Sequence, residues 1–138
     1  YEIMPSLVGS EMCIRDRVYT TRVTLTPEEA SSRWEIDLGD VRESARVFVN
    51  GKPVGTAWSV PFTLTADDCF IPGDNEIRIE VTNLPANRIS AMDRRGVPWR
   101  KFKEINLVDI NYKKTGYGDW AVVPSGLNSY VKLRRMKP

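Results

Sequence analysis

The chain has 138 residues, of which 41% are hydrophobic and 28% are charged, and its formal net charge is +2. This length suits one domain with an ordinary core, and no apolar run approaches the ~20 residues that a membrane span needs. The absence of histidine removes the commonest general base and zinc ligand, and the small net charge gives no reason to expect a polyanionic partner.

The first residues look foreign to a folded domain. Residues 7–17 read LVGSEMCIRDR and resemble the translation of a transposon adapter used in preparing sequencing libraries. We therefore interpret residues 1–17 as an assembly artefact without a structural part, as one would treat a fusion scar. The alternative is an ordinary N-terminal segment. On the first interpretation the domain covers residues 18–138, is truncated at its N-terminus, and has Cys69 as its only cysteine.

From Val18 onward the apolar residues alternate with a period of two, which predicts strands rather than helices. The expected strands cover residues 19–25, 34–38, 45–49, 54–58, 61–64, 77–81, 105–112 and 130–133. The dipeptide Asn50-Gly51 predicts a tight hairpin, because both residues tolerate positive φ. The spacing of Trp34, Trp58 and Trp120 is that of core residues. Short strands separated by turns predict an all-β fold, a β-sandwich or jelly roll.

One stretch, residues 84–103, breaks this alternation. It contains Pro85, Gly96 and Pro98 amid basic and aromatic residues. Loops of this length are uncommon unless they have a function. We therefore expect a long functional loop here, with room for a turn of helix.

This loop supplies the candidate contact residues. Asn83, Asn87 and Arg88 could bind sugar hydroxyls or tie the loop to the sheet, and the second use is favoured. Trp99 lies among basic residues, but acidic residues are interspersed throughout the chain, so nucleic acid is not expected. Trp99 could instead stack on a pyranose ring or dock against another domain, and docking is the leading interpretation. The expected substrate or interdomain contacts are Asn83, Asn87, Arg88, Asp93 and Trp99.

Catalytic residues are not expected in this chain. Glycoside hydrolysis uses two carboxyl groups ~5 to 9.5 Å apart, and no sequence feature pairs two of those available. The candidates considered are Asp67, Asp68, Asp93, Glu104, Asp109 and Asp119. We expect Asp67-Asp68 to solvate a turn or cap a short helix. No cofactor is expected, while a structural calcium ion held by carboxylates and carbonyls stays an open alternative.

Several motifs carry a resemblance to a known family. They are residues 34–41 (WEIDLGDV), 44–55 (SARVFVNGKPVG), Trp58, Pro61-Phe62, 72–77 (PGDNEI), 79–84 (IEVTNL) and 87–89 (NRI). The chain resembles the galactose-binding-like, sugar-binding jelly roll of glycoside hydrolases. It is most similar to the C-terminal domain of the α-L-rhamnosidase family, glycoside hydrolase family 106, and more distantly to the N-terminal jelly roll of family 2 β-galactosidases.

The resemblance implies a parent enzyme and a role within it. The parent would be a bacterial glycoside hydrolase of plant polysaccharide breakdown, periplasmic or secreted, with a catalytic domain N-terminal to this chain in the same polypeptide. The chain itself would be an inactive accessory domain that stabilises the enzyme or shapes its substrate cleft. The alternative is an autonomous carbohydrate-binding module. The expected partners are thus the catalytic domain and carbohydrate, without nucleic acid or a membrane.

Overall fold

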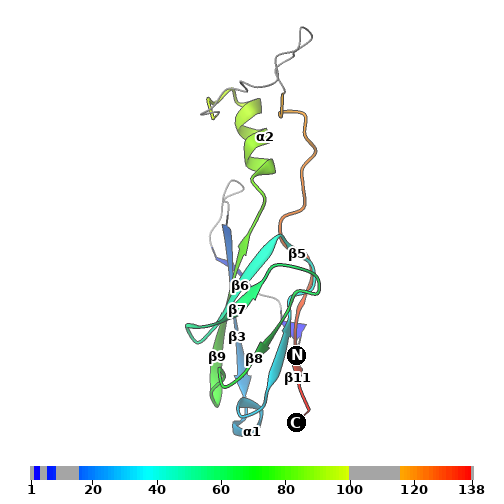
Figure 1. Ribbon diagram of the computed structural model, residues 1–138. Helices are drawn as coiled ribbons and strands as arrows, with labels where there is room; N and C mark the ends of the chain where they lie inside the picture. The colour runs from blue at the N-terminus through cyan, green and yellow to red at the C-terminus, as the bar shows by residue number, and fades with distance from the viewer. Residues whose placement is uncertain (1, 4–5, 9–15, 100–115, 138) are drawn as a thin grey trace. The chain divides into compact units, whose positions relative to one another are not determined.

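The computed structural model describes residues 2–3, 6–8, 16–99 and 116–137. The chain divides into two compact units, which we call the sandwich unit (Tyr1–Leu84 and Pro124–Pro138) and the helical unit (Pro85–Val123) (Figure 1). The strand expected over residues 105–112 lies outside the described part. No helix within the described ranges is long and apolar enough to cross a membrane.

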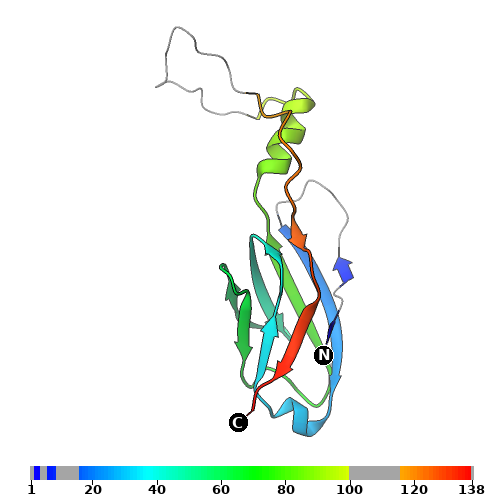
Figure 2. The same ribbon diagram turned by 90° about the vertical axis from the view of Figure 1, so that its right-hand side faces the viewer.

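The sandwich unit consists of antiparallel sheets. A five-stranded sheet has the order β2-β3-β9-β6-β7, a four-stranded sheet has the order β1-β11-β4-β8, and β10 pairs with β5. The bounds are β1 (Glu2–Ile3), β2 (Ser6–Val8), β3 (Asp16–Leu25), β4 (Trp34–Asp37), β5 (Val41–Arg42), β6 (Ser44–Val49), β7 (Lys52–Ala57), β8 (Thr63–Ala66), β9 (Gly73–Thr82), β10 (Gly126–Leu127) and β11 (Val131–Arg135). The view in Figure 2 shows β11, in red, beside β4, in cyan, within one layer. The predicted all-β sandwich is confirmed.

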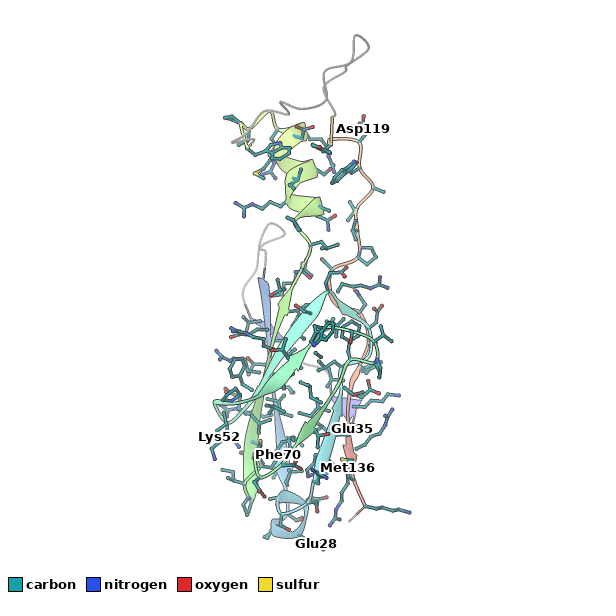
Figure 3. All side chains as sticks on the ribbon, viewed as in Figure 1. Glu28, Glu35, Lys52, Phe70, Asp119 and Met136 are labelled. Atoms are coloured by element: carbon teal, nitrogen blue, oxygen red, sulfur yellow. The ribbon has the colours of Figure 1, made fainter. Side chains whose placement is uncertain are left out.

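The core lies between the two sheets and follows from the alternation in the sequence. Ile77, Ile79 and Val81 of β9 are fully buried, while their neighbours along the strand face outward. From the other sheet, Trp34 and Ile36 point into the same core, and side chains fill the space between the layers (Figure 3). Each Å² of apolar surface that is buried stabilises the fold by about 25 cal/mol, so this cluster is the main source of stability.

The hairpin predicted at Asn50-Gly51 is also confirmed. Asn50 has φ 49° and Gly51 has φ 78°, the pair of positive values that a two-residue hairpin turn with the right twist requires. The turn joins β6 to β7, and the register shifts between the pairs Val47–Gly55 and Phe48–Pro53, so that Val54 of β7 is an extra, bulged residue.

A short helix lies between the strands that were expected over residues 19–25 and 34–38. Helix α1 (Pro27–Ala30) begins at Thr26, whose side chain accepts from the Glu29 N–H, while the Glu29 carboxylate accepts from the Thr26 N–H. This reciprocal capping satisfies backbone donors that a four-residue helix leaves open. Its end is fixed to the core, because the indole of Trp34 donates to the Glu29 carbonyl over 2.9 Å.

The structure differs from the expectation that residues 1–17 have no structural part. β1 pairs with β11, β2 pairs with β3, and β3 itself begins at Asp16 rather than near Val18. β1 and β2 are the terminal strands of their sheets and have two and three residues. The origin of this segment in an adapter stays a prediction.

Two further expectations were wrong. Trp58, expected in the core, is 76% exposed, because β7 ends at Ala57 and Trp58 begins the connection to β8. The expected loop after Leu84 contains a nine-residue helix, α2 (Ala86–Arg94). Sequence periodicity did not reveal α2 because Ser90 is its only buried residue, so it has no apolar stripe to mark it.

Candidate functional site

One asparagine, Asn87, joins the first and last segments of the helical unit. Asn87 lies in the first turn of α2, where its Nδ2 donates to the Val123 carbonyl and its Oδ1 accepts from the Val123 N–H, both over 2.8 Å. The side-chain amide thus pairs with one residue in both directions, as a neighbouring strand would. This is the tying role favoured for Asn87, directed to the segment before Pro124 rather than to the sheet.

Asp93 organises the other end of α2. Its Oδ2 accepts from the consecutive backbone N–H groups of Tyr117 (2.7 Å) and Gly118 (3.2 Å), and its Oδ1 accepts from the indole N–H of Trp99 (3.2 Å). Hydrogen bonds to a charged acceptor are stronger than neutral ones. One carboxylate therefore fixes the positions of Trp99 and of the turn that begins at Tyr117.

A close backbone approach holds this turn against α2. The Ser90 hydroxyl donates to the Gly118 carbonyl over 3.4 Å and accepts from the Arg94 guanidinium over 2.9 Å. A Cβ at Gly118 would lie 3.1 Å from Cγ of Arg94, which is tighter than an ordinary contact. The Trp120 N–H donates to the Tyr117 carbonyl over 3.2 Å and completes the turn.

Three aromatic rings meet on this turn, and we call Trp99, Tyr117 and Trp120 the aromatic cluster. The ring centroids of Trp99 and Tyr117 are 5.5 Å apart at an interplanar angle of 57°, and those of Tyr117 and Trp120 are 4.5 Å apart at 69°. Tilted and edge-to-face arrangements of this kind are the favoured ones for aromatic pairs. Trp120, expected in the core, is instead 44% exposed, because it lies in this turn and not in a strand.

The helical unit has no apolar core among its described residues. Ser90 is the only one of them that is buried, whereas Val97 and Val122 are 45% and 77% exposed. The described contacts within the unit are the polar ones of Asn87, Asp93 and Ser90 and the ring contacts of the aromatic cluster. A unit of this kind keeps apolar side chains available to a partner.

Two of the predicted site residues, Asn83 and Arg88, do not take part in these contacts. Asn83 belongs to the sandwich unit, where it is buried and its Oδ1 accepts from the Gly126 N–H over 2.7 Å. Arg88 lies on α2 with its side chain exposed and, among the residues that the structure describes, has neither a hydrogen bond nor an ion pair. The structure therefore brings Asp93 and Trp99 together, keeps Asn87 and Arg88 on the same helix, and places Asn83 elsewhere.

The described carboxylates outside the helical unit are engaged mainly by arginines. Asp67 accepts from Nε and Nη2 of Arg33 over 2.5 and 2.9 Å, and these hydrogen bonds hold the pKa of the Asp67 carboxyl below its usual range. Its neighbour Asp68 has φ 51°, which fits the expected turn. Asp40 is likewise paired with Arg42. Glu104 and Asp109 lie outside the described residues.

No metal site stands out in the described part of the chain, where no three histidine, cysteine, aspartate or glutamate side chains come together. A calcium ion held largely by backbone carbonyls stays a prediction. Cys69 is a free thiol whose Sγ donates to the Asp67 carbonyl over 3.0 Å, and Cys13 lies outside the described residues.

Sequence reasoning missed Tyr117 and misplaced Trp120. A signal was present, since Tyr117 stands between Gly116 and Gly118 in a stretch without strand alternation. Glycines on both sides of an aromatic residue favour a turn that presents the ring. The partner carboxylate, Asp93, is 24 residues away in sequence, so the contact itself could not be read from local pattern.

Comparison with known proteins gives two informative matches, and no protein-family profile matches the chain. A putative beta-glucuronidase of Formosa agariphila is 43% identical over 61 residues, which are 44% of this chain and 5% of that protein. The structure of a rhamnosidase from Novosphingobium sp. PP1Y matches 86% of this chain and 10% of its own, with 27% identity and a TM-score of 0.64. The chain is thus similar to small parts of glycoside hydrolases and spans a small fraction of their length.

Proposed function

We propose that this chain is a non-catalytic accessory β-sandwich domain, of the galactose-binding-like kind, from a bacterial α-L-rhamnosidase-like glycoside hydrolase. The observation that carries the proposal is the likeness to the Novosphingobium rhamnosidase, which extends over 86% of this chain but only 10% of that one. A match of this kind is what one domain of a large multidomain enzyme gives. The substrate would be a plant polysaccharide, and the enzyme would act in the periplasm or outside the cell.

The engagement of the described carboxylates supports a non-catalytic role. A glycosidase needs one carboxyl group that can give up a proton and a second one within ~5 to 9.5 Å. Among the described residues, Asp93 accepts from the N–H groups of Tyr117, Gly118 and Trp99. Asp67 accepts from the Arg33 guanidinium, which lowers the pKa of the Asp67 carboxyl. Such carboxylates are suited to holding the structure rather than to donating protons.

The exposed apolar residues of the helical unit support docking on the catalytic domain. A unit of roughly 40 residues is marginal by itself, and its described residues form no apolar core, with Val97, Trp120 and Val122 exposed. Aromatic residues and arginine are enriched where proteins associate, which fits Trp99 and Arg88. In this proposal the helical unit borders the substrate cleft of the larger enzyme.

The test is removal of this domain from the larger enzyme. We expect the enzyme without it to lose thermal stability or substrate affinity, and we expect the separately produced chain to restore part of the loss when added back. Full activity and unchanged stability without the domain would contradict an accessory role.

The runner-up is an autonomous carbohydrate-binding module, which the exposed Trp120 also fits. The two functions are distinguished by the affinity for an oligosaccharide derived from the substrate, measured for the chain alone and within the larger protein. An autonomous module binds with the same dissociation constant alone and within the larger protein. An accessory domain binds far more weakly alone, because the catalytic domain supplies most of the site.

A further inference from the structure

We infer that Trp120 is the stacking platform of a site for a neutral pyranose ring, positioned by Tyr117 and Asp93. This inference rests on the proposed function and deepens it, because it names the residue of the helical unit that contacts the sugar. From the sequence, Trp99 was the tryptophan that could stack on a pyranose ring. Trp120 is the more accessible of the two residues, since it is 44% exposed whereas Trp99 is only partly exposed.

The first step is that Trp120 is held in place before any ligand arrives. Its backbone N–H donates to the Tyr117 carbonyl, and its ring packs on that of Tyr117 with centroids 4.5 Å apart. Tyr117 is fixed in turn by the Asp93 carboxylate, which accepts from its backbone N–H over 2.7 Å. A side chain ordered in advance loses little entropy when a ligand binds, so even a small contact area contributes to affinity.

The second step concerns the chemistry that an exposed, fixed indole recognises. A pyranose ring has a face of C–H groups and a rim of hydroxyl groups, so its apolar face can cover an aromatic ring while the rim stays hydrated. Small-molecule sites combine such an apolar surface with few polar groups that set orientation. Here the adjoining residue, Asp119, is exposed (Figure 3) and has no hydrogen bond or ion pair with the residues described. Its carboxylate can accept from a sugar hydroxyl.

The charge near Trp120 favours a neutral sugar over an anionic one. The Asp119 carboxylate, which has no ion pair with the described residues, repels an anionic ring at short range. A neutral deoxy sugar such as rhamnose therefore fits this site better than a uronic acid, and a phosphate-bearing nucleotide is disfavoured for the same reason. The methyl group of rhamnose adds further apolar area for the indole.

The experiment is saturation-transfer NMR on the complete chain with two probes, methyl α-L-rhamnopyranoside and methyl β-D-glucopyranosiduronate. We expect transfer to the rhamnoside with a dissociation constant in the millimolar range, and weaker transfer to the glucuronide. Trp120→Ala should weaken rhamnoside binding at least tenfold, whereas Trp120→Phe should keep part of it. Trp58→Ala is the matched control, since it removes another exposed indole, and should leave binding unchanged. Asp119→Asn should reduce the difference in affinity between the rhamnoside and the glucuronide.

Three results would overturn the inference: no transfer to either sugar, transfer that survives Trp120→Ala, or transfer that is lost in Trp58→Ala. The amide spectrum of each variant verifies its fold, and the Trp120→Phe variant decides the matter should the alanine variant unfold. These failures are distinct from failure of the proposed accessory role, which the domain-removal experiment decides without reference to Trp120.

Discussion

Asn50 and Asn75 are joined side chain to side chain, with Nδ2 of Asn50 donating to Oδ1 of Asn75 over 2.8 Å. Asn75 is fully buried, and its Oδ1 also accepts from the Ile71 N–H, while its Nδ2 donates to the carbonyls of Ile71 and Gly73. An amide side chain has two donor and two acceptor positions, and Asn75 uses all four. The pair fastens the β6–β7 hairpin to the segment that enters β9.

Asn75→Ala should therefore be strongly destabilising. It removes the side-chain partner of the Ile71 N–H and carbonyl groups and one of the hydrogen bonds of the Asn50 amide. The expected loss in free energy of unfolding is about 3 kcal/mol. Urea denaturation measures it. Asn128→Ala, at an exposed asparagine, is the control and should cost less than about 0.5 kcal/mol. Similar stability of the two variants would show that the buried network contributes nothing.

Asn75 also marks the limit of what the sequence could predict. A strand over residues 77–81 was expected, and the burial of Ile77, Ile79 and Val81 followed from its alternation. That the Asn75 side chain would turn inward could not be predicted, because its partners include Asn50, which is 25 residues away. Local pattern specifies strands and turns, whereas a polar network depends on their assembly.

The tryptophans also include one residue whose position the sequence predicted correctly and two whose positions it did not. Trp34 was correctly expected in the core, since it alternates with Glu35 along β4. Trp58 lies at the end of an expected strand and Trp120 lies in none, and hydrophobicity alone was a poor guide because exposed apolar residues are common. In the candidate site, Asp93 and Trp99 were each predicted as contact residues. Their contacts with the turn at Tyr117 could not be predicted, because these depend on how the chain between Trp99 and Tyr117 folds back.

The Arg33–Asp67 pair should make a pH-dependent contribution to stability. The pKa of Asp67 is lowered by hydrogen bonds from Arg33, so the contribution is fully present above the ordinary aspartate pKa of ~3.9 and is lost as the pH falls through the folded-state value. Arg33→Ala should raise the carboxyl pKa of Asp67, measured by carbon NMR. Lys52→Ala, at another exposed cation, should leave it unchanged. An equal titration in wild type and Arg33→Ala would contradict the pairing.

Deletion of residues 1–15 tests the interpretation of the N-terminal segment. β1 and β2 have only two and three residues and lie at the ends of their sheets. We expect the deletion to change the free energy of unfolding by less than about 1 kcal/mol. Thermal unfolding followed by circular dichroism is the measurement, with the complete chain as reference. A large fall in melting temperature would identify the segment as a genuine part of the fold.

In the larger enzyme, Trp99→Ala combined with Arg88→Ala should weaken interdomain association or substrate affinity by about 2 kcal/mol or more, as loss of interface hot spots does. The sandwich core should keep its stability, because neither residue belongs to it. Enzyme kinetics and unfolding of the isolated chain are measured side by side. Loss of stability in the isolated chain together with unchanged enzyme kinetics would show that these residues have only a structural role.

The most direct test of the central claim is the release of para-nitrophenol from aryl rhamnosides and aryl glucuronides by the purified chain. An accessory domain should release it no faster than buffer, while the larger enzyme that contains the domain should hydrolyse at least one of these substrates. Turnover that co-purifies with the chain and disappears in Asp93→Ala or Glu104→Ala would contradict the account, because it would place a catalytic carboxylate within this domain.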